Sequence, residues 1–348
     1  MHSLWPLRLI IILYPQKLIL SGIVEKGGGK MNVSVLGCGR WGTFLAWYAN
    51  KIGHTVTLWG RESSRNYLRL NETRTNDYLT LPQKILLTNS LEKAVSTGEI
   101  IIISISAQEL RLFTEQLRLI KTTNKIFVLC MKGLEASSGK RLSEVFNEAV
   151  SKNINLAIWV GPGHVQDYHN NIPNCMVIDS ENIEITKKVV EEFSSDLIRL
   201  YYGNDLIGNE IGAAAKNVMG IAAGMLDGLN YSSLKGALMA RGTRELSRLV
   251  LAMGGNDLTI YGLSHLGDYE ATLFSKHSHN RKFGQAFVTG ESFDKLAEGV
   301  ATVQSLKYLS QQYEIELPIC NAVYDILFED KDTRETLFNL FLRPVTFE

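Results

Sequence analysis

The stretch "VSVLGCGRWGTFLAWYA", residues 33–49, decides the fold of this chain. It opens with a β-branched apolar run, continues with Gly37, Gly39 and Gly42 in the spacing G-x-G-x-x-G, and ends in an amphipathic segment. In a strand–turn–helix unit the first glycine permits a tight turn, the second lets a pyrophosphate approach the backbone, and the third lets the helix pack closely. The helix N-terminus also favours an anion. The stretch therefore predicts a dinucleotide-binding unit, with a merely tight turn as the alternative.

Short apolar runs alternate with longer amphipathic segments from Met31 to about residue 200. The runs are almost continuously apolar, which is typical of a mostly parallel sheet covered by helices on both faces. They lie at residues 55–59, 84–88, 99–106, 125–133, 156–163, 175–180 and 197–205. After Asp205, a candidate helix N-cap, the chain has helical spacing only. We predict an α/β fold: an N-terminal Rossmann-type doubly wound parallel sheet over residues 31–203, followed by an all-α C-terminal domain over residues 204–345.

Composition gives no sign of a charged partner. The 348 residues include 36 Lys or Arg and 36 Asp or Glu, so the formal net charge is zero. Without a basic excess or a basic run, nucleic acid is not an expected partner. The four cysteines lie far apart with no C-x-x-C, which favours neither a zinc site nor a disulfide framework and fits a cytoplasmic protein.

Residues 1–30 are an apolar extension that Arg8, Pro15 and Lys17 interrupt. The stretch is too short and too broken to span a bilayer, so we expect no stable membrane insertion. We interpret it as an upstream translated stretch, with the functional chain starting at Met31. A structured or disordered extension and a poor signal peptide are the alternatives.

The end of the second expected strand bears on the choice of cofactor. An acidic residue there normally binds the ribose 2′-hydroxyl of NAD, whereas an Arg suits the 2′-phosphate of NADP. This chain has Gly60, Arg61 and Glu62 at that point. Arg61 favours NADP and Glu62 keeps NAD open, while a solvated surface Arg is the alternative.

Lys216 lies in "IGAAAKNVMGIAAGML", residues 211–226, whose helical face around the lysine carries small residues. Small residues on one face indicate close packing by another helix or by a ligand. Burial lowers the pKa of a lysine and so makes it a possible general acid/base near neutral pH. A lysine whose ammonium extends from the packing face to solvent is the alternative.

Two loops at the carboxyl ends of expected strands, where ligands bind in such folds, add further candidates. Lys132 follows the fifth strand, and Gly161 and Gly163 follow the sixth with free backbone N–H groups. The segment 265–284 gathers polar side chains that could reach a phosphate. Its His277 and His279 lack a third ligand at suitable spacing, so we predict no metal site.

Together "GCGRWG", "MKGLE", "VGPG", "GAAAKNVMGIAAGMLDG", "GLSHLGD" and "HNRKFG" resemble, in order and spacing, the NAD(P)-dependent glycerol-3-phosphate dehydrogenases. The resemblance runs from Met31 to about residue 340. It implies reversible reduction of dihydroxyacetone phosphate by NAD(P)H to sn-glycerol 3-phosphate, which supplies glycerophospholipid synthesis. It leaves a homodimer open.

The resemblance also implies roles for individual residues. Lys216 matches the acid/base, with Lys132 and Asp268 as its catalytic partners. The substrate-binding positions are Lys132, Gly161, Gly163, Lys216, Asn217, Asp268, Thr272, Ser278, His279 and Asn280. The cofactor-binding positions are Gly37, Gly39, Arg40, Trp41, Gly42, Arg61, Lys132, Val165, His279, Leu296 and Glu298.

Three residues depart from the family's pattern: Val160 and Gly163 replace hydroxyl side chains, and His279 replaces an Arg. Because histidine is only partly protonated at neutral pH, we expect phosphate or cofactor affinity to weaken as pH rises unless Arg281 substitutes. Two rival functions are a related two-domain hydroxyacid or 6-phosphogluconate type dehydrogenase and a non-catalytic NAD(P)-binding sensor.

Overall fold

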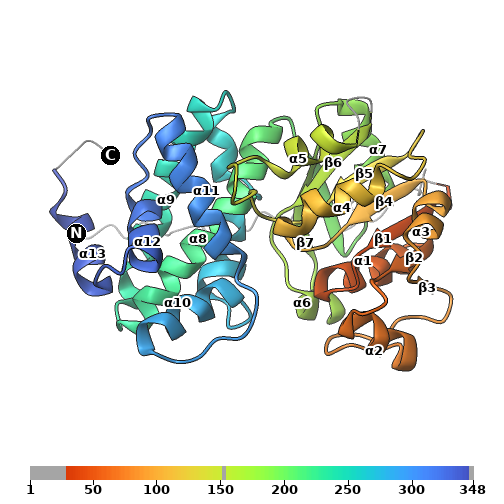
Figure 1. Cartoon of the computed structure of the whole chain (residues 1–348), viewed down its shortest axis with the longest axis horizontal. Helices are drawn as coiled ribbons and strands as arrows, with labels where there is room; N and C mark the ends of the chain where they lie inside the picture. Colours follow the sequence, from red (N-terminus) through yellow and green to blue (C-terminus); the bar gives the residue numbers. More distant parts are fainter. Residues whose placement is uncertain (1–28, 151–153, 345–348) are drawn as a thin grey trace, which may run out of the picture.

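The structure, a computed structural model, describes residues 29–150 and 154–344. A sheet and a bundle of helices lie side by side (Figure 1). The described sheet has eight strands in the order β3-β2-β1-β4-β5-β6-β7-β8. Their bounds are β1 Asn32–Leu36, β2 Thr55–Trp59, β3 Leu86–Thr88, β4 Ile100–Ile103, β5 Ile126–Leu129, β6 Asn155–Val160, β7 Asn174–Asp179 and β8 Ile198–Tyr202. This is the Rossmann-type sheet that the apolar runs predict.

One part of the sheet differs from the predicted parallel arrangement. β6 and β7 pair antiparallel, whereas every other neighbouring pair is parallel. The connection between them contains only the short helix α6, Val165–His169. Such a helix is too short to carry the chain back along a strand, so β7 returns beside β6 in the opposite direction.

Helices cover both faces of the sheet, as the continuous apolar strands predict. On one face, Phe44 and Tyr48 pack with Trp159 and Phe193. On the other, Phe113 packs in a cluster with Phe127 and Phe146. The helices of the sheet half are α1 Arg40–Lys51, α2 Arg65–Thr73, α3 Leu91–Thr97, α4 Leu110–Leu117, α5 Leu142–Ala149, α6 Val165–His169 and α7 Ile183–Phe193.

The turn between β1 and α1 needs its first and third glycines. Gly37 has a φ of 118°, and a Cβ there would lie 2.1 Å from the carbonyl oxygen of Ser104. A Cβ on Gly42 would lie 1.9 Å from the carbonyl oxygen of Gly37. The backbone approaches that the G-x-G-x-x-G spacing implies are therefore present.

The helical half is built around α8, Leu206–Gly228, which is buried over most of its length. The predicted N-cap is confirmed, because the Asp205 side chain accepts from the backbone N–H of Gly208 at 3.1 Å. Helices α9, α10, α11 and α12 all contact α8. The other helices are α9 Lys235–Ala252, α10 His279–Thr289, α11 Glu298–Gln312, α12 Pro318–Phe328 and α13 Thr333–Asn339. Single turns lie at η1 Ala107–Glu109, η2 Ser232–Leu234, η3 Asp257–Tyr261, η4 Leu266–Asp268, η5 Glu270–Phe274 and η6 Leu340–Leu342.

The small residues of α8 permit close contact with protein elements. A Cβ on Gly224 would lie 1.9 Å from the backbone oxygen of Arg281 in α10. A Cβ on Gly220 would lie 2.9 Å from Cγ2 of Thr272. Another helix and the segment before it therefore account for the close packing that the sequence left open.

The predicted extension, residues 1–30, lies outside the described residues except for Gly29 and Lys30. In the described part of the chain, no helix combines the length and apolar character needed to cross a bilayer.

Candidate active site

A cleft of about 880 Å³ lies where the sheet half meets the helical half. Most of the sequence-predicted site residues line it: Gly37, Gly39, Arg40, Trp41, Arg61, Lys132, Gly163, Val165, Lys216, Asn217, Asp268, Thr272, Ser278, His279, Asn280, Leu296 and Glu298. Gly42 instead packs behind the glycine turn, and the carbonyl of Gly161 accepts from Nζ of Lys132 at 2.5 Å. The fold thus brings together residues that are far apart in the sequence.

Two lysines from different halves share one carboxylate. Oδ2 of Asp268 lies 2.7 Å from Nζ of Lys216 and 2.8 Å from Nζ of Lys132. The Asp268 side chain is only 1% exposed, so its charge is screened little by water. Nζ of Lys216 also donates to Oγ1 of Thr272 at 2.9 Å.

The ammonium of Lys216 is buried, so the alternative of a lysine reaching bulk solvent is wrong. Burial lowers its pKa to about 8, and the nearby charge of Lys132 lowers it too, whereas Asp268 acts in the opposite direction. A lysine with a pKa near the working pH can both give and take a proton. The cluster of Lys216, Asp268 and Lys132 is therefore suited to proton transfer at a carbonyl or hydroxyl oxygen.

A chain of side-chain amides fixes the two halves beside this cluster. Nδ2 of Asn217 donates to the carbonyl oxygen of Lys132 at 3.0 Å. Oδ1 of Asn217 accepts from Nδ2 of Asn280 at 3.0 Å, and Oδ1 of Asn280 accepts from the N–H of Gly299 at 2.9 Å. Asn217 thus positions the Lys132 loop as well as lining the cleft.

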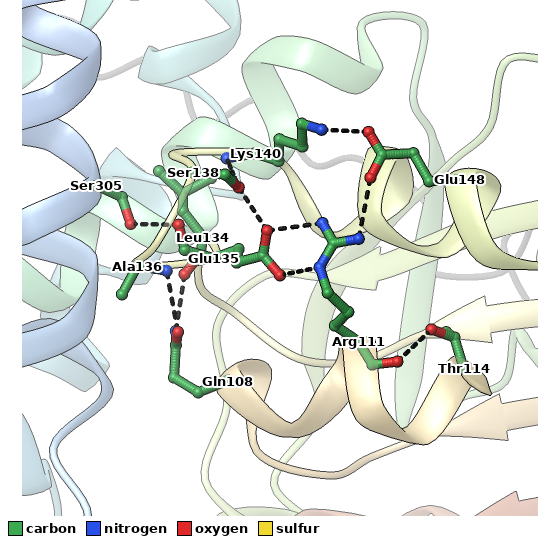
Figure 2. A network of polar contacts seen from close by, with 10 residues as sticks. All are labelled: Gln108, Arg111, Thr114, Leu134, Glu135, Ala136, Ser138, Lys140, Glu148 and Ser305. Carbon is green, nitrogen blue, oxygen red and sulfur yellow. Dashed lines mark hydrogen bonds and ion pairs between the residues drawn. The ribbon is translucent and has the colours of Figure 1, made fainter. Parts of the chain in front are cut away.

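The loop that follows Lys132 is held by a polar network between the two halves (Figure 2). Arg111 of α4 binds both carboxylate oxygens of Glu135, at 2.6 and 2.8 Å. The carbonyl oxygen of Glu135 accepts from Oγ of Ser305 in α11 at 3.1 Å. Gln108 donates to the carbonyl oxygen of Leu134 at 2.8 Å. These contacts restrict the loop on the side away from the cleft.

The other end of the cleft fits a nicotinamide dinucleotide. The glycine turn and the start of α1 form one wall, and a Cβ on Gly39 would meet no atom within 4 Å. Oε1 of Glu298 accepts from Oγ of Ser106 at 3.1 Å, while its buried Oε2 has no hydrogen-bond partner among the described residues. Burial raises the pKa of Glu298. An unpaired acceptor of this kind suits an amide N–H donor such as a carboxamide.

His279 and Arg281 lie in different environments. Nδ1 of His279 lies 3.3 Å from the carbonyl oxygen of Leu296 at the cleft. Burial lowers the pKa of His279, and the charge of Arg40 lowers it further. Nε of Arg281 is paired with Oδ2 of Asp227 at 2.6 Å, and Arg281 does not line the cleft. Arg281 therefore does not take the place of the arginine that the resemblance implies at position 279.

Sequence reasoning missed His164, a histidine that lines the cleft. His277 pairs with His164 rather than with His279: the two rings lie edge to face with centroids 5.6 Å apart, and both line the cleft. The buried Nε2 of His164 has no hydrogen-bond partner in the described residues. Only the position of His164 after a strand could have indicated it. No group of three or more His, Cys, Asp or Glu side chains within residues 29–150 and 154–344 is arranged to hold a metal ion.

Comparisons with known proteins identify the family of this chain. A family model described as the NAD-dependent glycerol-3-phosphate dehydrogenase N-terminus matches residues 32–186, and one described as its C-terminus matches residues 205–338. The chain belongs to the NAD-dependent glycerol-3-phosphate dehydrogenase family. One curated relative, glycerol-3-phosphate dehydrogenase (NAD(P)+) from Thermoanaerobacter sp. (strain X514), is 37% identical over 329 residues, covering 91% of this chain and 99% of the relative. A second, from Chlorobium limicola, is 34% identical over 326 residues, covering 90% and 98%.

Solved structures agree with the family. A glycerol-3-phosphate dehydrogenase from Coxiella burnetii is 28% identical and superposes with a TM-score of 0.84, covering 90% of this chain and 99% of that one. A D-mandelate dehydrogenase is 11% identical with a TM-score of 0.62, over 90% of this chain and 100% of that one, which shows a shared fold alone. The hydroxyacid rival therefore has the architecture in common with this chain.

Proposed function

We propose that this member of the glycerol-3-phosphate dehydrogenase family catalyses the reversible NAD(P)H-dependent reduction of dihydroxyacetone phosphate to sn-glycerol 3-phosphate. The observation that carries the proposal is the buried Lys216 ammonium, paired with Asp268 in a cleft that begins at the glycine turn. A sensor without turnover would not need a buried lysine whose pKa is lowered toward neutrality, so the complete cluster favours the enzyme.

The proposed chemistry assigns one step to each member of the cluster. NAD(P)H supplies the hydride when bound. In the reductive direction Nζ of Lys216 gives its proton to the substrate's carbonyl oxygen, and in the oxidative direction it takes the hydroxyl proton. Asp268 orients Lys216, and Lys132 polarises the carbonyl oxygen. Both lysines place positive charge where the oxygen becomes negative, which stabilises the transition state.

We also propose how the ligands are shared between the halves. Residues 31–203 form the NAD(P)-binding domain and residues 204–345 the substrate and catalytic domain. The substrate is bound by the backbone at Gly163, the side chains of Asn217 and Thr272, and the segment 278–280, while Gly161 acts through its contact with Lys132. Supply of glycerophospholipid synthesis, a cytoplasmic location and a homodimer are proposed from family membership.

Loss of the Lys216 ammonium should strongly reduce turnover, while NADPH should still bind. In Lys216→Met we expect kcat with NADPH and dihydroxyacetone phosphate to fall by about 100- to 10,000-fold, the usual size of a general acid/base contribution. The Kd for NADPH, measured by fluorescence titration, should not change. Lys235→Met is a matched control, since Lys235 is also buried and pairs with Asp227 at 2.7 Å outside the cleft. Undiminished turnover in Lys216→Met would refute the assignment.

We propose that NADP is preferred over NAD. Arg61 lines the cleft and is largely exposed. Its ion pair with Glu109, at 3.0 Å, lies at the surface, so its guanidinium can turn to a 2′-phosphate. In Arg61→Ala we expect KM for NADPH to rise about tenfold, the equivalent of one charge-assisted hydrogen bond, and KM for NADH to stay the same. Steady-state kinetics with NADPH and NADH test this preference. Equal effects on the two cofactors would contradict it.

A further inference from the structure

One short segment, residues 265–274, carries Asp268 and Thr272, which both contact the Lys216 ammonium. Asp268 ends η4, and Thr272 lies in η5. Two other side chains of the segment, His265 and Tyr269, are polar and completely buried, with exposed fractions of 0%. Neither takes part in the proposed chemistry, so their contacts need another explanation.

His265 binds the segment to the helix that carries Lys216. Its Nδ1 lies 2.9 Å from the carbonyl oxygen of Gly212. A carbonyl can only accept, so Nδ1 carries the proton and donates. That carbonyl lies one helical turn before Lys216 and is where an α-helix places the acceptor for the Lys216 N–H. The backbone carbonyl of His265 in turn accepts from the N–H of Asp268 at 3.0 Å.

The other ring nitrogen extends the connection to a third element. With the proton on Nδ1, Nε2 of His265 is an acceptor, and the hydroxyl of Tyr269 donates to it at 2.6 Å. The Tyr269 hydroxyl also lies against α9, 3.5 Å from Oγ1 of Thr243, whose proton is donated to the carbonyl oxygen of Met239 at 2.7 Å. Burial lowers the pKa of His265 to about 4, so the ring is neutral throughout the neutral range, and its two hydrogen bonds set the tautomer.

Close packing at Gly212 fixes the distance between α8 and His265. A Cβ on Gly212 would lie only 3.0 Å from Cβ of His265. The hydrogen-bonded connection runs from α8 through His265 to Tyr269, which packs against α9, and Asp268 lies between these two residues in the sequence. Displacement of Asp268 from Lys216 therefore requires breaking buried hydrogen bonds, each of which leaves an unsatisfied group.

We propose that His265 and Tyr269 are positioning residues, which hold Asp268 and Thr272 at the distance from Lys216 that proton transfer requires. The proposal rests on the proposed function, because it assumes that Lys216 is the acid/base. It assigns no direct contact with substrate or cofactor to either residue.

The proposal has a consequence for pH dependence that a purely stabilising role would lack. The charged or titratable groups that act on Lys216 are Asp268, Lys132, His164 and His265. Of these, Asp268 raises the Lys216 pKa against the effect of burial. If Asp268 moves away, the pKa falls below about 8. Lys216 would then lose its proton at lower pH, and the reductive rate would decline from a lower pH.

The test uses three variants of the full-length enzyme. His265→Leu keeps most of the volume and removes both ring contacts, so kcat should fall about 10- to 100-fold, as for a misplacement of about 1 Å. His265→Asn restores a donor toward Gly212 and should recover most of this loss. Tyr269→Phe keeps the Gly212 contact, and kcat should fall about fivefold, the equivalent of one hydrogen bond. In His265→Leu and Tyr269→Phe the alkaline decline of reductive kcat/KM should move to lower pH, with the Kd for NADPH unchanged.

Tyr48→Phe is the matched control. The buried Tyr48 hydroxyl donates to the carbonyl oxygen of Phe193 at 2.5 Å in the sheet half, so its loss should lower the melting temperature without altering the pH profile. If His265→Leu behaves like Tyr48→Phe, the positioning role is wrong. Should His265→Leu not fold, an unmoved pH profile in Tyr269→Phe overturns the proposal equally. A wild-type enzyme that does not oxidise NADPH with dihydroxyacetone phosphate would instead refute the proposed function, whereas turnover retained in Lys216→Met would refute only the acid/base assignment.

Discussion

The sequence resemblance implies that His279 stands where the family has an arginine. A phosphate beside an arginine always meets a full positive charge, whereas a phosphate beside His279 meets one only when the imidazole is protonated. Since burial and the charge of Arg40 lower the His279 pKa, the charged form is confined to more acidic solution than for an ordinary histidine. Arg281 is occupied by Asp227 and does not compensate.

We therefore expect phosphate affinity to decrease as pH rises through the His279 pKa, and His279→Arg to remove that part of the dependence. The substitution should lower KM for dihydroxyacetone phosphate at pH 8 by about tenfold, as expected for a gained charge-assisted contact. The measurement is KM against pH for both proteins. Ionisation of the substrate phosphate affects both proteins equally, so the difference between their KM curves reports the contribution of residue 279. Parallel KM curves would show that His279 is not a phosphate ligand.

The element that organises the site is α8. Its first turns are tied to the sheet half by Glu210, which binds Arg141 at 2.9 Å and accepts from the N–H of Ser143 at 2.9 Å. Its middle carries Lys216 and Asn217, and its last turns lie against α10 through Gly224. Because α10 begins at His279, the depth of this helix crossing sets how far the segment 278–280 lies from Lys216.

Gly224→Ala should destabilise the protein. The new Cβ would meet the carbonyl oxygen of Arg281 at 1.9 Å, so the helices must separate, and such overpacking typically costs about 1–3 kcal/mol. Gly236→Ala is the matched control within another helix, α9: its Cβ would meet nothing within 4 Å, and alanine there should be neutral or stabilise by up to about 1 kcal/mol. Urea denaturation gives both free energies of unfolding. Equal values for the two variants would contradict close packing at Gly224.

At the scale of the whole molecule, local sequence patterns predicted which segments form strands and helices better than they predicted how those elements are arranged in space. Continuous apolar runs predicted the strands and the burial of both sheet faces, because covering helices leave little room for polar residues. They did not predict the reversed direction of β7 and β8, since an apolar run reads the same whichever way its strand points. The length of the connection that contains α6 was the available signal.

The candidate site shows the same division. Lys216 was singled out because it lies among small residues on a helix, and Lys132 because it follows a strand. That they share one oxygen of Asp268 depends on the docking of the two halves, which no local pattern encodes. His265 and Tyr269 were not singled out, because buried polar residues are recognised only once their hydrogen-bond partners are known.

The contact between Lys132 and Asp268 also limits how such a protein can evolve by exchange of parts. Lys132 comes from the half matched by the N-terminal family model, and Asp268 from the half matched by the C-terminal one. A recombinant gene that joins halves from two relatives would inherit every local motif intact. It would work only if its two halves docked as they do here, because Lys132 and Asp268 meet across the boundary between them. Docking of the halves is therefore a requirement that keeping each motif intact does not meet.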